Sequence, residues 1–164
     1  MAITYEPIAT TTLGSTATTV SFTSISGAYT DLVLITSIKA SGGDTNQFMR
    51  FNSDTGSNYS STNVYGDGSS ALSTRQSSVD KINAVLSGYL TTGQNAPGIY
   101  HIMNYSNTTT YKTMLSRFNH SAVVVQAEVS LWRSTSAITA IEIFTTPNSF
   151  ASGSTFTLYG IKAA

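Results

Sequence analysis

The chain has 164 residues, the length of one ordinary domain, and 40% of them are hydrophobic, enough for burial to offset the entropy of ordering the chain. Only 10% are charged, and the eight basic and eight acidic side chains leave no net charge, so the composition does not favour nucleic acid as a partner. There is no cysteine, which excludes disulfides, thiolate catalysis and thiolate metal sites.

The apolar stretches are rich in Thr, Val, Ile, Tyr and Phe and alternate with a period of two, and no long window shows helical spacing. We therefore predict an all-β chain with about ten strands and little or no helix. In chain order, the predicted strands cover residues 3–11, 17–23, 30–39, 46–52, 79–88, 98–105, 111–119, 122–132, 137–145 and 154–162.

Two segments near the start of the chain have particular roles in this prediction. Residues 1–12 contain Pro7, which cannot donate to a neighbouring strand, so we predict either an assembly arm or an edge strand there. Residues 31–39 are almost continuously apolar, which predicts a strand that is buried on both faces or central in its sheet and that anchors the core.

Two later segments are distinguished by their side-chain patterns. Residues 54–78 are rich in Ser, Gly and Asn and show little alternation, so we expect a long loop and the first place to look for a variable contact surface. In residues 122–132, one set of alternate residues is apolar and the other is polar. We expect the apolar set to face the core and the polar set to face solvent. The apolar set is Val123, Val125, Ala127, Val129 and Leu131, and the polar one is Gln126, Glu128 and Ser130.

No fixed repeat and no linker divides the chain, so residues 1–164 are predicted to form one domain. Short strands at this spacing favour two packed antiparallel sheets, as a jelly roll or a related Greek-key sandwich, with a closed barrel as the alternative. No apolar run approaches the ~18 residues of a membrane span, and the first residues lack signal-peptide features. We expect a chain that neither enters nor crosses a membrane unaided.

Few residues suggest catalysis. His101 and His120 have no acidic residue or second histidine at metal-ligand spacing, so both are interpreted as wall or surface residues. Glu128 and Glu142 lie on consecutive predicted strands and could form a glycosidase-like pair, but both alternate with residues expected to face solvent. No nucleophile elbow and no phosphate-binding loop is present. We therefore predict a protein that is not an enzyme, with no catalytic or cofactor-binding residue.

Two other groups of side chains could bind ligands. Oxygen ligands for calcium could come from turn residues, although their spacing does not match an EF-hand, so calcium binding stays open and no metal ligand is assigned. These are Asp44, Asp54 and Asp67 with Asn46, Asn52 and Asn58. A stacking surface for sugars or a partner could come from the tyrosines, although tyrosine also fills strands as half-buried packing. These are Tyr59, Tyr65, Tyr89, Tyr100, Tyr105 and Tyr111.

Several phrases together resemble a family of small virion proteins and fibre-tip domains of tailed bacteriophages, in which the closing strand Leu158-Tyr-Gly-Ile-Lys162 recurs. The phrases span most of the chain and lie at residues 29–34, 51–60, 102–106, 111–113, 131–134 and 150–162.

The resemblance implies a non-enzymatic β-sandwich located in the virion and assembled in the bacterial host cytoplasm. The first expectation is a capsid decoration (cement) protein that binds the major capsid protein or other virion proteins. The alternative is a head or tail fibre domain that binds a host-surface receptor or glycan. Together with the sparse charge, the resemblance also predicts a homo-oligomer, with a trimer as the first expectation.

Overall fold

The structure, a computed structural model, describes residues 4–120 and 124–162, which form twelve β-strands and no helix. The strands are β1 (Tyr5–Thr12), β2 (Thr19–Phe22), β3 (Asp31–Ile38), β4 (Thr45–Phe51), β5 (Tyr59–Gly66), β6 (Ala71–Val79), β7 (Ile82–Leu90), β8 (Ala96–Met103), β9 (Lys112–His120), β10 (Val124–Trp132), β11 (Ile141–Thr146) and β12 (Thr155–Ile161). Within the described ranges there is no helix that could span a membrane.

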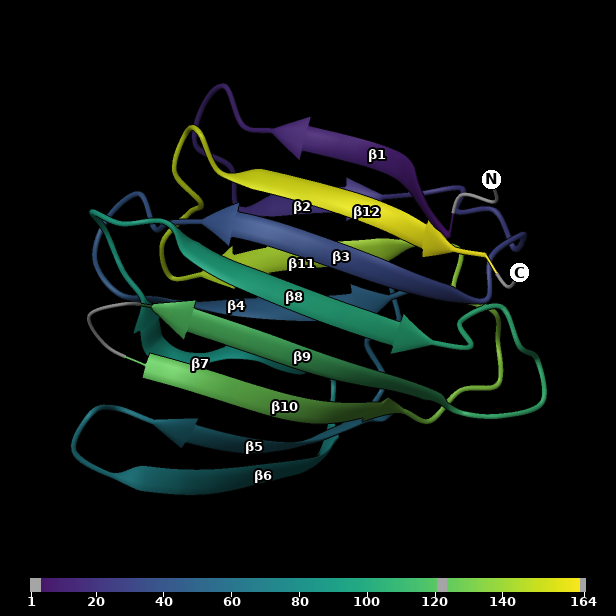
Figure 1. The fold of residues 1–164 in the computed structure, drawn as a ribbon. Helices are drawn as coiled ribbons and strands as arrows, with labels where there is room; N and C mark the ends of the chain where they lie inside the picture. The colour runs from purple at the N-terminus through teal and green to yellow at the C-terminus, as the bar shows by residue number, and fades with distance from the viewer. Residues whose placement is uncertain (1–3, 121–123, 163–164) are drawn as a thin grey trace.

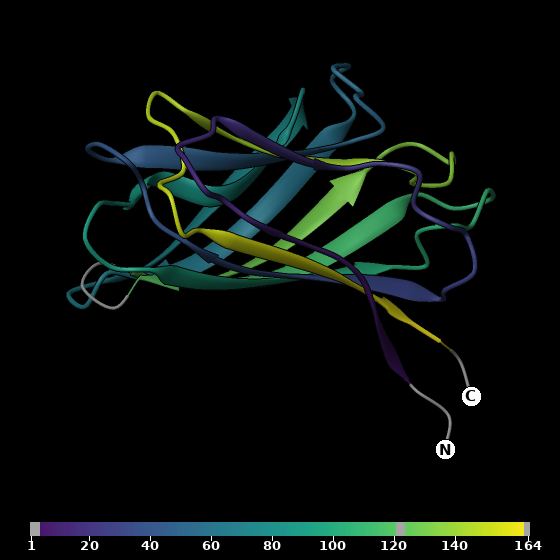
Figure 2. The same cartoon turned by 90° about the horizontal axis from the view of Figure 1, so that it is seen from above.

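The strands form two antiparallel sheets that lie one over the other (Figures 1 and 2). The large sheet has eight strands in the order β1-β12-β3-β8-β9-β10-β5-β6, and the small sheet has four in the order β2-β11-β4-β7. The predicted all-β, two-sheet sandwich is therefore confirmed. The closed-barrel alternative is wrong, because both sheets end in edge strands.

The strand order is that of a jelly roll with two inserted hairpins. Strands β1, β12, β3 and β8 of the large sheet oppose β2, β11, β4 and β7 of the small sheet, which is the strand order of an eight-stranded jelly roll. The β5–β6 hairpin follows β4, and the β9–β10 hairpin follows β8. Both hairpins join the large sheet beyond β8, and we call these four strands the extension.

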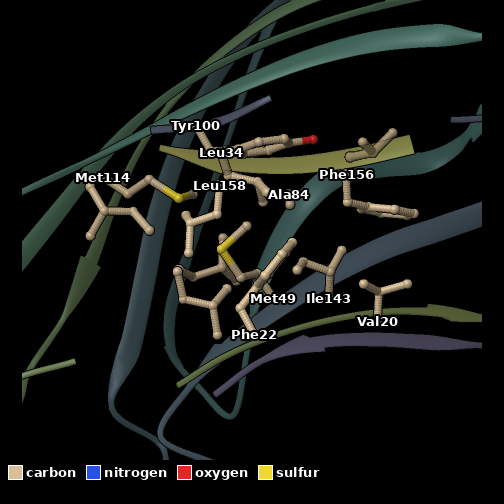
Figure 3. Packing of buried hydrophobic residues seen from close by; sticks show 14 of the residues in the cluster. Val20, Phe22, Leu34, Met49, Ala84, Tyr100, Met114, Ile143, Phe156 and Leu158 are labelled. Atoms are coloured by element: carbon tan, nitrogen blue, oxygen red, sulfur yellow. The ribbon is translucent and has the colours of Figure 1, made fainter. Parts of the chain in front are cut away.

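The core lies between the two sheets and is built from alternate side chains of facing strands (Figure 3). Strand β3 pairs with β12 on one side and β8 on the other, which confirms the predicted central strand. The fully buried or nearly fully buried members labelled in Figure 3 are Val20, Phe22, Leu34, Met49, Ala84, Tyr100, Met114, Ile143, Phe156 and Leu158.

The long loop predicted over residues 54–78 is wrong, because most of this segment is the β5–β6 hairpin. The described residues form twelve strands instead of about ten. Ser, Thr and Asn occupy both faces of this hairpin, so no apolar alternation marks it in the sequence. At the other edge of the large sheet, β1 pairs with β12, and its register shifts between Pro7 and Ala9. Residues 1–3 of the segment predicted as an arm or edge strand lie outside the described residues.

Candidate functional site

The extension has one face toward the small sheet and one toward solvent. Strand β10 pairs with β9 on one side and with β5 on the other, and β6 closes the sheet beyond β5 (Figure 1). The small sheet ends at β7, so it covers only part of the inner side of these four strands.

Apolar side chains line the outer side of the extension. Val125 is 63% exposed, Val64 57%, Val129 51% and Leu115 47%. Leu115 and Val129 are direct partners across β9 and β10, and a contiguous apolar surface of this kind is uncommon on a soluble monomer. We call it the apolar face, and its residues are Val64, Leu115, Val125, Ala127, Val129 and Leu131.

One end of the apolar face is hollowed into a groove of about 870 Å³. It is lined by residues of β8, of the last part of β9 and of the first part of β10, and β5 and β6 form one side. Most of the lining is apolar, with Arg117 and Asn119 among the polar contributors. The main apolar lining residues are Val64, Ala71, Leu72, Pro97, Ile99, Val125 and Ala127.

Only two charged side chains lie on the outer side of the extension, Arg75 and Arg117. They occupy outward positions on β6 and β9, and neither takes part in a salt bridge within the described residues. No carboxylate accompanies them on this side of the four strands. The outer side is thus apolar with a slight positive charge.

The predicted orientation of β10 is wrong. The two sets of alternate residues are separated as expected, but the apolar residues Val125 and Val129 face solvent, while Gln126, Glu128 and Ser130 are 6%, 1% and 1% exposed. Val123, which belongs to the apolar set, lies outside the described residues. The reason is that the inner side of β10 faces the free edge of β7, where unpaired backbone groups favour polar partners.

Polar side chains on the inner side of β5 and β10 form a connected cluster, the polar cluster of Asn63, Gln126, Glu128 and Ser130. Gln126 Nε2 donates to Asn63 Oδ1 at 2.7 Å and to Glu128 Oε2 at 3.4 Å. Ser130 donates its hydroxyl to Glu128 Oε1. The Gln126 amide also accepts from the Leu86 N–H at 3.3 Å and donates to the Ala84 carbonyl at 3.5 Å. The Gln126 side chain thereby forms hydrogen bonds with two backbone groups at the edge of β7.

Glu128 is the most perturbed carboxyl group in this cluster. Burial raises its pKa to about 7, against the smaller opposing effect of hydrogen bonds from Ser130 and Asn63. Such a pKa would suit proton transfer, but the side chain is 1% exposed and enclosed by other protein groups. Glu128 therefore acts in this structure as part of the packing between the sheets.

Glu142, proposed as a neighbour of Glu128, lies on the other sheet. It is on β11 between the buried residues Ile141 and Ile143, so it points to the outer side of the small sheet, and its cross-strand partner is Arg50. Glu128 points into the sandwich from β10. The two carboxylates do not form a pair, and the expectation that Glu128 faces solvent is also wrong.

The two histidines lie on opposite sides of the large sheet. His101 Nε2 is 2.9 Å from Asp31 Oδ2 on the outer side, a pairing between residues 70 positions apart that local spacing could not reveal. Its cross-strand neighbours are Val33 and Leu115, neither of which is a nucleophile. His120 is buried on the inner side, with Nε2 3.0 Å from Thr91 Oγ1. Neither arrangement resembles a catalytic triad.

Four of the six residues considered as calcium ligands, Asn52, Asp54, Asn58 and Asp67, use their side chains in hydrogen bonds within the protein. Asp54 accepts from Trp132 Nε1 at 2.7 Å and from Asn58 Nδ2 at 2.9 Å. Asp67 accepts from the backbone of Ser69 and Ser70 at the tip of the β5–β6 hairpin. Asn52 accepts from the backbone of residues 139 and 140. Within the described residues, no three His, Cys, Asp or Glu side chains form a group that could hold a metal ion.

The tyrosines do not form one stacking surface. Tyr59, Tyr100 and Tyr105 are completely buried, and Tyr111 is exposed. Tyr65 and Tyr89 pack against the core with ring centroids 5.8 Å apart. Packing is therefore the main role of these side chains, and the apolar face, which lies on different residues, is the better candidate for a binding surface.

No family model matches the chain, and no curated protein matches it. Among solved structures, it is similar to a variant of alginate lyase Aly36B in complex with an alginate trisaccharide, with 9% identity, a TM-score of 0.37, and coverage of 93% of this chain and 80% of that one. Aly36B itself has 9% sequence identity and a TM-score of 0.33, and the match covers 94% of this chain and 80% of that one. A protein of unknown function from Shewanella oneidensis MR-1 has 9% sequence identity and a TM-score of 0.23, and the match covers 98% of this chain and 77% of that one. Likeness at these TM-scores carries no argument about this chain.

Proposed function

We propose that the chain is a non-enzymatic structural protein of a tailed-phage particle, and that it attaches to other virion proteins through the apolar face. The observation that carries this proposal is the exposure of Val64, Val125 and Val129 side by side on the extension. A surface of this kind gains free energy when another protein covers it. The resemblance of the sequence phrases to small virion proteins supports the proposed role in a phage particle.

Within the particle, the proposed role is capsid decoration, with the major capsid protein as the partner. A decoration protein binds a repeated shell lattice, and a broad, nearly uncharged sheet surface is suited to covering such a lattice. The alternative is a head or tail fibre domain, for which the groove beside Val125 would hold a receptor segment.

The side chains with catalytic potential support a structural role. Glu128 is enclosed in the polar cluster, His120 is buried, and the His101–Asp31 pair has no nucleophile as a cross-strand neighbour. The proposed function involves neither a cofactor nor a metal.

Quantitative mass spectrometry of purified particles tests the location. Hundreds of copies per particle would support decoration of the shell, and a few to a few dozen would support a fibre. Absence of the protein from purified particles would overturn both forms of the proposal.

The contact surface can be tested with undecorated shells purified from particles that lack this protein. A variant carrying Val125→Lys and Val129→Lys should bind these shells at least about tenfold more weakly, because two charges would have to be desolvated. The matched control carries Thr19→Lys and Ser21→Lys on the exposed side of β2 and should bind normally. Equal binding by both variants would exclude the apolar face as the attachment surface.

A further inference from the structure

The four edge strands of the sandwich are not equally protected. An exposed sheet edge presents unpaired N–H and C=O groups and tends to pair with another chain, so soluble proteins block such edges. The edges here are β1 and β6 of the large sheet and β2 and β7 of the small sheet. Comparing them identifies one that remains open.

Three of the edges carry recognisable protection. Strand β1 contains Pro7, its register shifts there, and Glu6 is held in an ion pair with Lys162. Strand β2 has only four residues. Strand β7 pairs irregularly with β4, and the side chain of Gln126 occupies the backbone groups of Ala84 and Leu86.

Strand β6 has none of these features along most of its length. It has nine residues without proline or glycine, and its register with β5 is regular from Ala71 to Ser77. Arg75 is its one charged residue. Leu72, a large apolar residue of this edge strand, is 44% exposed. A long, regular edge with an exposed leucine is the geometry that favours strand pairing.

We propose that β6 pairs antiparallel with β6 of a second copy of this chain, about a two-fold axis close to Ser73, so that the two eight-stranded sheets become continuous. Self-pairing of identical strands is isologous and closes at two copies. The assembly is therefore a dimer, in place of the trimer expected from the sequence.

The position of the axis follows from the charge and backbone of β6. An axis at Arg75 would bring two guanidinium groups opposite each other, and like charges in that position are destabilising. Toward the end of the strand, Ser78 has a φ of 55°, which breaks the extended backbone. An axis at Ser73 places Arg75 opposite Ala71 and Leu72 opposite Thr74, which covers the exposed leucine.

The groove on the apolar face favours a second copy as the occupant of this edge. Ala71, Leu72 and Ser73 form the outermost side of the groove, and the sheet ends there. A second copy joined at Ser73 would continue the sheet and merge the two grooves across the axis. With no net charge, two copies also have little long-range repulsion to overcome.

Edge pairing over about five residues makes an interface below the ~1,200 Å² of total buried area typical of stable complexes, so we expect a weak dimer with micromolar affinity. Light scattering with size-exclusion chromatography at about 100 µM protein should therefore give the mass of two chains. Ser73→Lys would place two ammonium groups together at the axis and should give a monomer. The control Thr12→Lys, on the opposite edge strand β1, should remain dimeric. Circular dichroism establishes that both variants are folded.

The absence of cysteine allows a direct test of the axis. Under mild oxidation, the Ser73→Cys variant should form a disulfide-linked dimer, because residue 73 of each copy faces its counterpart. Thr12→Cys is the matched control at the other edge and should stay unlinked. A monomer or trimer in light scattering, or equal cross-linking of the two cysteine variants, would overturn the proposed dimer.

Discussion

Gln126 Nε2 donates a 2.7 Å hydrogen bond to Asn63 Oδ1 inside the sandwich, where both side chains are buried. The two residues lie on neighbouring strands of the extension, and the same Gln126 amide contacts the backbone of β7. The polar cluster therefore joins the inserted hairpins to the edge of the jelly-roll core.

Glu128 should make the protein less stable as the pH rises. Burial raises its pKa from 4.5 to about 7, so between these values the folded state keeps a proton that the unfolded chain releases. The free energy of unfolding therefore falls with rising pH across this window, by up to on the order of 3 kcal/mol, and levels off above it.

Urea denaturation at about pH 5 and about pH 8 measures this effect as a change in unfolding free energy. Glu128→Gln cannot titrate, so its unfolding free energy should vary less between the two conditions than that of the wild type. Glu142→Gln, on the outer side of the small sheet, should keep the wild-type dependence. The prediction fails if the Glu128→Gln and wild-type proteins show the same dependence on pH.

Gln126→Met should destabilise the protein although the side-chain volume is nearly kept. The substitution leaves Asn63 Oδ1, the Ala84 carbonyl and the Leu86 N–H without the amide that now contacts them. Each unsatisfied buried polar group costs about 1–3 kcal/mol, so we expect a loss in that range or above it. Val125→Met introduces the same side chain on the exposed side of β10 and should change stability by less than about 0.5 kcal/mol. Urea midpoints that shift equally for both variants would contradict the assigned role of Gln126.

The sequence predicts the fold better than it predicts which sides of the strands are buried. A nearly continuous apolar run identifies β3, and period-two alternation identifies β12 and separates the two faces of β10, because both signals depend only on neighbouring residues. Burial of Gln126 and Glu128 depends on β7 and β5, which arrive from distant parts of the chain. The sequence pattern therefore groups Val125, Ala127, Val129 and Leu131 correctly but assigns them to the core, and it does not indicate that Val64 and Leu115 join them.

The β5–β6 hairpin shows a second limit of local pattern. Ser61 and Asn63 are buried in β5, while Thr62 and Val64 are exposed, so polarity does not report burial there. The strand is specified by its pairing with β10, in which Asn63 faces Glu128 and Ser61 faces Ser130. Matching polar residues on the two strands are the signal that could have indicated the pairing.

Asp54→Ala should destabilise the protein through Trp132. Burial raises the pKa of Asp54, but hydrogen bonds from Trp132, Asn58 and the Gly56 N–H outweigh that effect and hold it below 3.8. Removing the carboxylate leaves the buried indole N–H without its 2.7 Å acceptor, at a cost of about 1–3 kcal/mol.

Thermal and urea denaturation at neutral pH compare Asp54→Ala with Asp44→Ala, an exposed aspartate on another loop that should change stability little. In the wild type, the contribution of Asp54 is present above the unfolded pKa and is lost as the pH falls through the lowered folded value. The stability gap between wild type and Asp54→Ala should therefore narrow in acid. A gap that is absent at neutral pH would refute the role given to Asp54.

Gly160→Ala should destabilise the closing strand by steric overlap with Tyr29. A Cβ atom built on Gly160 would lie 2.3 Å from two atoms of the Tyr29 ring, far inside van der Waals contact. These ring atoms include Cγ, next to the backbone, so the ring must move as a whole. Overpacking of this kind typically costs about 1–3 kcal/mol, and we expect Gly160→Ala to lose that much stability in urea denaturation.

A double-mutant cycle distinguishes the destabilisation caused by this overlap from any general destabilising effect of alanine in β12. Tyr29→Ala removes the ring that contacts Gly160, so Gly160→Ala should cost much less in the Tyr29→Ala background than in the wild type, and the two effects should be clearly non-additive. Gly14 provides the matched control, because a Cβ there meets nothing within 4 Å, and Gly14→Ala should be nearly neutral. Additive losses for Gly160→Ala and Tyr29→Ala would show that the ring does not require a glycine at position 160. Non-additive losses would give the glycine of Leu158-Tyr-Gly-Ile-Lys162 a structural reason, namely that it makes room for an aromatic side chain over the last strand.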